Sequence, residues 1–121
     1  MKALKTAAAA LCVGVATLAA SAPAFAWPDK SVTVIVPFPA GGSTDTIARA
    51  VSNHLGEQFK QSFVVDNKAG ATGSIGAAQV ARAPADGYTL LVASLAPFVV
   101  APHLIKGLPY DPTKDFTYLT V

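Results

Sequence analysis

The sequence predicts an α/β fold built on a mostly parallel sheet, and three observations lead to this prediction. Apolar, β-branched runs such as residues 31–36 have the length and composition of strands that are covered on both faces. Segments with apolar residues at helical spacing separate these runs. The resulting order, strand–helix–strand–helix–strand, favours crossover connections and parallel strand pairing.

The first 26 residues have the three parts of a secretory signal peptide. Lys2 and Lys5 form a basic start, an apolar stretch follows, and Ala24 and Ala26 occupy the two small-residue positions of an A-x-A cleavage site. The apolar stretch is rich in alanine and shorter than the about 20 apolar residues that a membrane-spanning helix needs. We therefore expect export to the periplasm and cleavage after Ala26.

Cleavage would change the charge balance of the chain. Two of the nine basic residues lie in the signal peptide, which leaves seven basic residues against seven acidic ones. The mature part has no cluster of lysine and arginine, and this argues against nucleic-acid binding. Cys12, the single cysteine, also lies in the signal peptide. We therefore expect neither a disulfide nor thiolate chemistry in the mature chain.

A helix is predicted to follow the first strand. Pro37 and Pro39 end the strand because proline cannot donate to a sheet ladder. Ser43, Thr44 and Asp45 offer capping and first-turn acidic side chains for the helix that follows. Its apolar residues recur every three or four positions and predict one core-facing side, made of Ile47, Ala48, Val51, Leu55 and Phe59.

The remaining elements are shorter. Residues 63–65 predict a second strand followed by a polar turn, residues 74–82 a short helix, and residues 88–93 a third strand. Residues 98–105 predict a short helix or turn, and a last strand is expected to begin near Tyr118. Because this strand-like run ends without a closing turn, we expect residues 27–121 to form an incomplete lobe.

Two glycine-rich loops, at residues 39–45 and 69–76, follow the first two strands. Ligands of parallel sheets bind beyond the carboxyl ends of the strands, where glycines allow close approach and helix N-termini offer unpaired N–H groups. The loops therefore predict a site for an anionic oxygen, with the alternative that the glycines serve only to turn the chain. Asp45 would repel a carboxylate, so we expect it to cap the helix or to meet an amino or hydroxyl group of the ligand.

Catalytic and metal-binding alternatives have little support in the sequence. The spacing of Gly70, Gly73 and Gly76 matches neither a dinucleotide fingerprint nor a phosphate-binding loop, and no G-x-S-x-G nucleophile elbow occurs. His54 has no further metal-ligating residues at suitable spacing, so we expect it at the surface. We predict no enzyme activity, no cofactor and no metal site.

Four ordered blocks resemble the substrate-binding proteins of tripartite tricarboxylate transporters, the Bug family of extracytoplasmic receptors. The blocks are VTVIVPFPAGGSTDTIAR at 32–49, VVDNKAGATGSIGA at 64–77, APADGYTLL at 83–91 and LPYDPTKDF at 108–116. The resemblance implies a type II periplasmic-binding-protein fold, in which two α/β lobes close on a ligand. This chain would supply only the first part of the first lobe, with the second lobe absent.

The resemblance also implies a function and a set of site residues. The implied function is capture of a small carboxylate for membrane transporter subunits. The alternatives are ligand presentation to a sensor kinase of a two-component system, an exported enzyme, or a non-functional truncated remnant. The implied ligand-binding residues are Phe38, Ala40, Gly41, Gly42, Ser43, Thr44 and Asp45 in the first loop, Ala71, Thr72, Gly73 and Ser74 in the second, and Ser94 after the third strand.

Overall fold

The computed structural model describes residues 26–120, and the predicted signal peptide lies outside this range except for Ala26. Three parallel strands form one sheet in the order β2-β1-β3. They are β1 (Val32–Val36), β2 (Phe63–Asn67) and β3 (Thr89–Leu91). The predicted α/β class with a parallel sheet is therefore confirmed.

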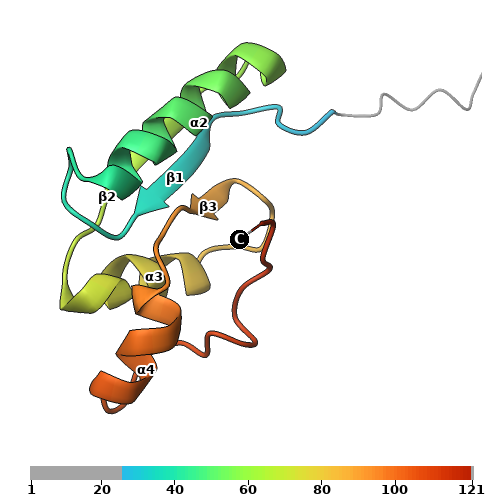
Figure 1. Cartoon of the computed structure of the whole chain (residues 1–121). Coiled ribbons are helices and arrows are strands. Elements are labelled where there is room, and N and C mark those ends of the chain that lie inside the picture. The colour runs from blue at the N-terminus through green and yellow to red at the C-terminus, as the bar shows by residue number, and fades with distance from the viewer. Residues whose placement is uncertain (1–25, 121) are drawn as a thin grey trace, which may run out of the picture.

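Helices cover both faces of this sheet (Figure 1). Helix α2 (Ser43–Phe59) lies over β1 and β2 on one face, and α3 (Ser74–Ala81) lies on the other. After β3, the chain forms a π-type turn, η3 (Ala96–Val100), which continues into α4 (Ala101–Leu104). These two elements confirm the helix or turn that the sequence predicted near residues 98–105.

Strand β1 is the centre of the core. Val32, Val34 and Val36 are almost fully buried and pack with Ala48 of α2 and Phe63 of β2. Since successive side chains of a strand point to opposite faces, the buried Ile35 lies on the face of α3. Each such side chain contributes about 1.5–3 kcal/mol when it is fully buried. A strand with apolar residues on both faces is stable only between two covering layers, which the helices supply.

A second core forms beneath the opposite face of the sheet. Ala77 and Ala78 of α3 pack with Tyr110, and half-buried apolar residues of β3 and the C-terminal segment surround them. The hydroxyl of Tyr110 donates to the carbonyl of Pro97 at 2.6 Å. This contact fixes the irregular segment after α4 to the turn η3, so the segment packs against the lobe although it has no regular structure.

An aromatic cluster lies at the amino edge of the sheet. The ring of Trp27 stands edge-on to Phe59 and Phe63, with centroid distances of 5.6 and 6.5 Å, and lies 6.2 Å from Tyr88. The ammonium group of Lys30 lies 4.2 Å from the centroid of the Tyr88 ring, a cation–π contact. Trp27 therefore ties the start of the folded part to the end of α2 and to the beginnings of β2 and β3.

The buried face of α2 agrees in part with the predicted one. Ala48 is buried and Leu55 packs against the core, as expected, but Ile47 and Val51 are 59% and 46% exposed. The other buried side chains of the helix are the polar Asp45 and Ser52, which share helical spacing with Ala48. Small side chains at 48 and 52 let the helix approach the sheet closely, and Asp45 is tolerated because it is fully hydrogen-bonded, as described below.

Two strands differ in their bounds from the predictions, and a third predicted strand is absent from the described residues. β2 continues through Asp66 and Asn67, which were expected in a turn, and β3 is shorter than expected. The predicted strand near Tyr118 is wrong, since residues 117–120 have no regular structure. The ring of Tyr118 instead packs 5.5 Å from that of Phe98, and its hydroxyl donates to the carbonyl of Pro112 at 2.8 Å.

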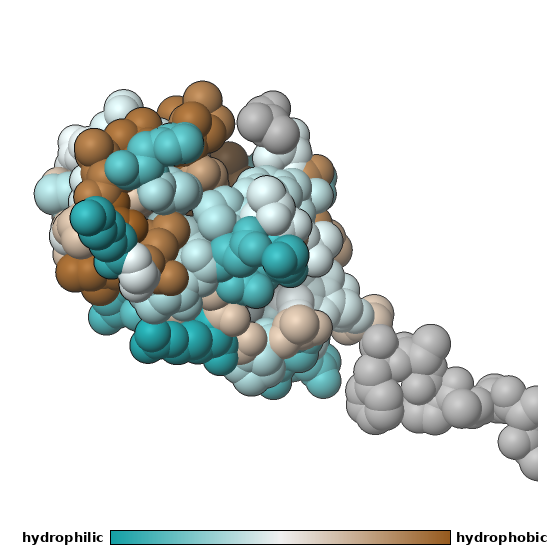
Figure 2. All heavy atoms as spheres, turned by 90° about the horizontal axis from the view of Figure 1, so that it is seen from below, coloured by the Kyte–Doolittle hydropathy of each residue, from teal (hydrophilic) through white to brown (hydrophobic). Residues whose placement is uncertain are grey.

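Apolar side chains remain exposed on η3 and α4. Figure 2 views the molecule from the side of these elements and shows hydrophobic surface there. Apolar patches on a protein surface often mark sites of interaction with other protein, a membrane or a ligand. The exposed residues are Leu95, Val99, Val100 and Leu104.

We predict that Gly76→Ala destabilises the fold by about 1–3 kcal/mol, the usual cost of overpacking. A Cβ at this position would lie 2.8 Å from Cβ of Pro37 and 3.1 Å from the carbonyl oxygen of Lys68, and backbone cannot move aside easily. Urea unfolding measures the decrease in the free energy of unfolding. Gln79→Ala, at an exposed position of the same helix, is the control and should change stability by less than about 0.5 kcal/mol. Equal stability of the two variants would contradict the prediction.

Candidate functional site

The two glycine-rich loops leave the sheet side by side at its carboxyl edge. The parallel register pairs Val36, the last residue of β1, with Asn67, the last residue of β2. The loops also touch, since a Cβ at Gly73 would lie 3.3 Å from Cζ of the Phe38 ring. The structure therefore brings the two predicted loops together, as the parallel sheet required.

The first loop ends in an open helix N-terminus. Gly42 is the N-cap of α2 in an extended conformation, and the first helical bond runs from the N–H of Thr46 to the Gly42 carbonyl at 2.9 Å. Ser43 and Thr44 were expected to cap the helix, but no side-chain cap bond forms at the N-cap. Within residues 26–120, the N–H groups of residues 43–45 have no acceptor. They are available to an anion.

The second loop has an unusual backbone conformation. Gly70, Ala71, Thr72 and Gly73 all have positive φ angles, of 137°, 45°, 57° and 85°. For a β-branched residue such as Thr72 the left-handed region is a true outlier, with a cost of about 1–2 kcal/mol. Such strain persists where the surrounding structure holds it, and it gathers at functional sites.

The same conformation determines which donors of the second loop are free. The N–H of Gly73 donates to the Gly70 carbonyl at 2.9 Å. The backbone N–H of Ser74 donates to the Ala71 carbonyl, and so does its hydroxyl, at 2.7 Å. In the described part of the chain, the N–H groups of Ala71 and Thr72 have no acceptor. These two groups belong to exposed residues at the same edge of the sheet as the free donors of the first loop.

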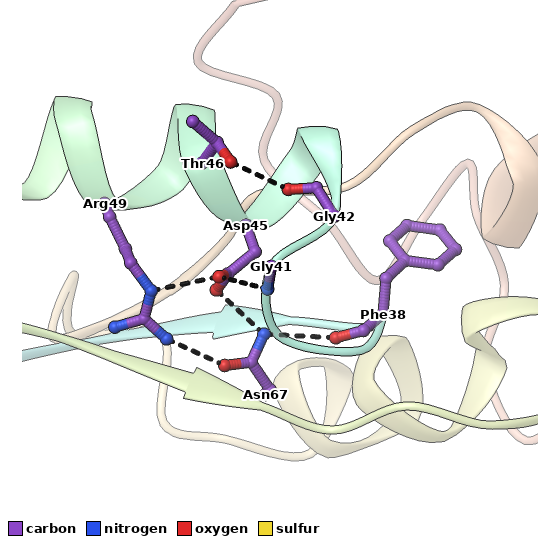
Figure 3. A network of polar contacts seen from close by, with 7 residues as sticks. All are labelled: Phe38, Gly41, Gly42, Asp45, Thr46, Arg49 and Asn67. Atoms are coloured by element: carbon purple, nitrogen blue, oxygen red, sulfur yellow. Dashed lines mark hydrogen bonds and ion pairs between the residues drawn. The ribbon is translucent and has the colours of Figure 1, made fainter.

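Asp45 forms the centre of a polar network between α2, the first loop and β2 (Figure 3). Its side chain is buried, and Oδ2 accepts hydrogen bonds from the N–H of Gly41 at 2.8 Å and from Nε of Arg49 at 3.0 Å. Oδ1 accepts a hydrogen bond from Nδ2 of Asn67 at 2.9 Å. The expected cap does not form, since Asp45 instead accepts from an N–H of the first loop that precedes the N-cap. Both oxygens of its carboxylate are engaged within the protein.

The electrostatics of the network favour the charged form of Asp45. Hydrogen bonds from Arg49, from the Gly41 N–H and from Asn67 lower the pKa of this carboxyl to about 2, although its burial acts in the opposite direction. The ion pair with Arg49 is half exposed on the arginine side. Asp45 is therefore a fixed anion over the whole range in which the protein would function.

Arg49 and Asn67 belong to the site region but were not predicted. Arg49 lies outside the predicted core-facing side of the helix and is half exposed, while Asn67 was expected in the polar turn after the second strand. The structure instead has Nη2 of Arg49 donating to Oδ1 of Asn67 at 3.0 Å, and Nδ2 of Asn67 donating to the carbonyl of Phe38 at 3.1 Å. The four-residue spacing of Asp45 and Arg49 was a signal for their pairing. Nothing local indicates the long-range contacts of Asn67.

The other predicted residues differ in accessibility. Ala40, Gly41, Gly42, Ser43, Ala71, Thr72 and Ser94 are exposed, Phe38 and Thr44 are half-buried, and Gly73 and Ser74 are buried. Ser94 follows β3, and its hydroxyl oxygen already accepts a long hydrogen bond, of 3.4 Å, from the N–H of Ala96. His54 is exposed, as predicted. Among residues 26–120, no three histidine, cysteine or acidic side chains gather in a group that could hold a metal ion.

Comparison with known proteins identifies the family. Residues 47–121, more than half of the chain, match the model of the tripartite tricarboxylate transporter family receptor. The chain belongs to this receptor family. The predicted resemblance is thereby confirmed. No helix within residues 26–120 has the length and apolar character needed to cross a membrane.

Curated relatives extend the comparison. A UPF0065 protein of Bordetella bronchiseptica is 45% identical over 95 residues, which cover 78% of this chain and 28% of the relative. BugT of Bordetella pertussis is 42% identical over 104 residues, covering 85% of this chain and 32% of BugT. The chain thus spans about a third or less of the length of these family members.

Solved structures of the family share the fold. A periplasmic transporter is 51% identical with a TM-score of 0.71, over 74% of this chain and 30% of that protein. MatC from Rhodopseudomonas palustris, with bound malate, is 42% identical with a TM-score of 0.70, over 75% and 31%. A second protein of the same organism, with adipate, is 41% identical with a TM-score of 0.65, over 72% and 29%. The predicted periplasmic-binding-protein fold is therefore confirmed.

We predict that Asp45→Asn flattens the acid dependence of stability. The pKa of Asp45 is about 2 in the folded state against an ordinary value of 3.8, so the unfolded state binds more protons between these values. Stability from this group is full above about pH 4 and is lost as the pH falls towards 2. Urea unfolding between about pH 5 and pH 2 should show a shallower loss in the variant.

Asp111→Asn is the comparison for this experiment. Hydrogen bonds from Thr113 and Lys114 also lower the pKa of Asp111 to about 2, but this residue lies outside the network of Asp45. Each single variant should remove part of the acid dependence, and the double variant should remove more than either one. An Asp45→Asn profile as steep as that of the unmodified chain would show that the network does not hold Asp45 ionised.

Proposed function

We propose that this chain is an exported solute-binding receptor whose two glycine-rich loops bind a small carboxylate. The observation that carries the proposal is the pair of open donor groups at one edge of the sheet, residues 43–45 in one loop and residues 71–72 in the other. Neutral N–H groups at a helix start bind anionic oxygens well, because they are unpaired and lie at the positive end of the helix dipole.

The relatives support a carboxylate as the anion. Two family members of known structure contain malate and adipate, which are small dicarboxylates. Asp45 is paired within the protein and does not oppose an anion with a free charge. Preformed backbone donors recognise the carboxylate group and leave the rest of the ligand to other contacts. Such a site explains how related receptors bind different acids.

The proposal is for binding without turnover. The hydroxyls of Ser74 and Ser94 at this edge are engaged with nearby backbone groups, and neither contacts a histidine or a carboxylate that would activate it. We propose delivery of the carboxylate to the membrane subunits of a tripartite transporter, and membership of the family supports this. Transport therefore accounts for the site better than catalysis does.

We also infer that residues 27–121 are the first part of one lobe of a two-lobed receptor. Two features support this division. The solved relatives are about three times as long as the matched region, and the exposed apolar residues of η3 and α4 offer a surface for further protein to cover. One lobe gives only one wall of a ligand cleft, so we expect this segment alone to bind weakly.

The carboxylate site can be tested with Gly42→Asp. Gly42 has φ −75°, and a Cβ there would lie 3.5 Å from the Pro39 carbonyl oxygen, so aspartate fits. As an N-cap it should maintain or slightly raise stability, while its charge occupies the open donors and repels the ligand. We expect affinity for malate and adipate to fall by about tenfold or more. NMR titration of the ¹⁵N-labelled chain measures even weak binding.

Two controls make this result specific. Gly107→Asp places the same charge at an exposed glycine with open space around it; its φ of +72° strains any side chain, so stability should fall somewhat while affinity stays unchanged. Adipamide, the uncharged diamide of adipate, should cause no shifts in the amide signals of residues 43–45 and 71–72. Equal binding by the Gly42→Asp and Gly107→Asp variants would place the carboxylate elsewhere.

Export and cleavage after Ala26 are likewise proposed, and N-terminal sequencing of the periplasmic protein tests them. The structure supports this boundary, because Ala26 is exposed whereas the Trp27 ring packs into the aromatic cluster. We expect the mature protein to begin at Trp27. Ala26→Phe, which replaces the small residue that the peptidase requires, should leave the precursor uncleaved. A mature protein that begins at another residue would contradict cleavage after Ala26.

A further inference from the structure

Asn67 occupies the position where the two loops are closest in the sheet. It is the last residue of β2 and the register partner of Val36, so the first loop begins beside it and the second loop follows it in the chain. The pairing continues one step further, with the N–H of Lys68 donating to the Val36 carbonyl at 2.8 Å. The half-buried side chain of Asn67 points towards α2 and the first loop (Figure 3).

The amide of Asn67 makes three hydrogen bonds with the opposite side of the site. Nδ2 donates to the Phe38 carbonyl at 3.1 Å and to Oδ1 of Asp45 at 2.9 Å. Oδ1 accepts from Nη2 of Arg49 at 3.0 Å. This geometry needs two donors and one acceptor on a single short side chain. Among the natural side chains of this length only asparagine supplies them, because aspartate has no donor when ionised.

These contacts act on the loop through Asp45 as well as directly. Phe38 begins the first loop, and its ring contacts Gly73 of the second. Asp45 holds the N–H of Gly41 at 2.8 Å and starts the helix whose free donors face the ligand. Asn67 therefore contacts the beginning of the first loop and the residue that fixes its end. No other side chain in residues 26–120 hydrogen-bonds to both of these places.

We propose that Asn67 is a positioning residue, which holds the first loop at the distance from the second at which both can bind one carboxylate. This inference rests on the carboxylate-binding function proposed above. Asn67 does not itself bind the carboxylate, because both of its N–H donors are already used by the Phe38 carbonyl and Asp45. Its effect is on the placement of backbone donors that do.

The test is Asn67→Asp, which keeps the size and the acceptor for Arg49 but loses both donors and faces the carboxylate of Asp45. We expect affinity for malate and adipate to fall by about tenfold, because misplaced supporting contacts loosen a preorganised site. We also expect amide exchange of Gly41 to quicken by about tenfold, since its acceptor is displaced. Asn53→Asp, at an exposed position of α2 without a side-chain bond in the described part, makes the same charge change and is the matched control.

A second variant separates positioning from a general loss of structure. Combining Asn67→Asp with Asp45→Asn exchanges amide and carboxylate, so a donor again faces an acceptor between the two positions and the like charges are removed. We expect this double variant to recover several-fold of the lost affinity. Urea unfolding of each variant confirms that binding is measured on folded protein. A purely structural defect would not be repaired in affinity by the exchange.

Each possible result either supports or overturns the role of Asn67 as a positioning residue. Weaker binding by Asn67→Asp, recovery in the exchanged variant and unchanged binding by Asn53→Asp support the inference. Unchanged affinity in Asn67→Asp, while Gly42→Asp still loses binding, overturns the inference and leaves the carboxylate site in place. A loss that the exchanged variant does not repair also overturns it. If the unmodified chain binds neither malate nor adipate, the proposed function fails, and the role of Asn67 in binding fails with it.

Discussion

The parallel pairing of β1 with both of its neighbours is the constraint on which the rest of the structure depends. β1 is buried on both faces, so its backbone groups must pair within the sheet and helices must cover each side. Because the strands run in the same direction, each connection crosses a face, and every following loop leaves at the same edge. The last residues of β1 and β2 are register partners, and the two loops therefore start next to each other. The candidate site is therefore a consequence of the strand register.

A buried carboxylate then fixes the details of that edge. Burying a charge is costly unless it is paired and hydrogen-bonded, and both oxygens of Asp45 have partners from three different segments. Apolar contacts at this point would have given comparable stability with less directional preference. The network instead fixes the start of α2 relative to the end of β2. Small residues below it, Ala48 and Ser52, allow the helix to approach the sheet.

The sequence predicted those features that depend on local pattern. β1 and α3 were expected close to their observed bounds, and glycine spacing located both loops. The face of α2 was predicted correctly at Ala48 and Leu55 but not at Ile47 and Val51. Two overlapping stripes satisfy helical spacing there, and the sequence does not reveal that Asp45 is hydrogen-bonded by groups from elsewhere. The role of Asn67 depends on partners 18 to 29 residues away, and local pattern carries no such information. Likewise, the aromatic contacts that keep Tyr118 out of a strand form only in the folded lobe.

The aromatic cluster around Trp27 and the two glycine-rich loops lie at opposite ends of the sheet. Trp27, Phe59, Phe63 and Tyr88 gather where the strands begin, whereas the two glycine-rich loops lie where they end. The length of β1, about 17 Å for five residues, separates the two regions. The chain therefore enters the lobe at the end of the sheet remote from the glycine-rich loops. A protein or label attached ahead of Trp27 would leave the edge of the sheet that carries the loops uncovered.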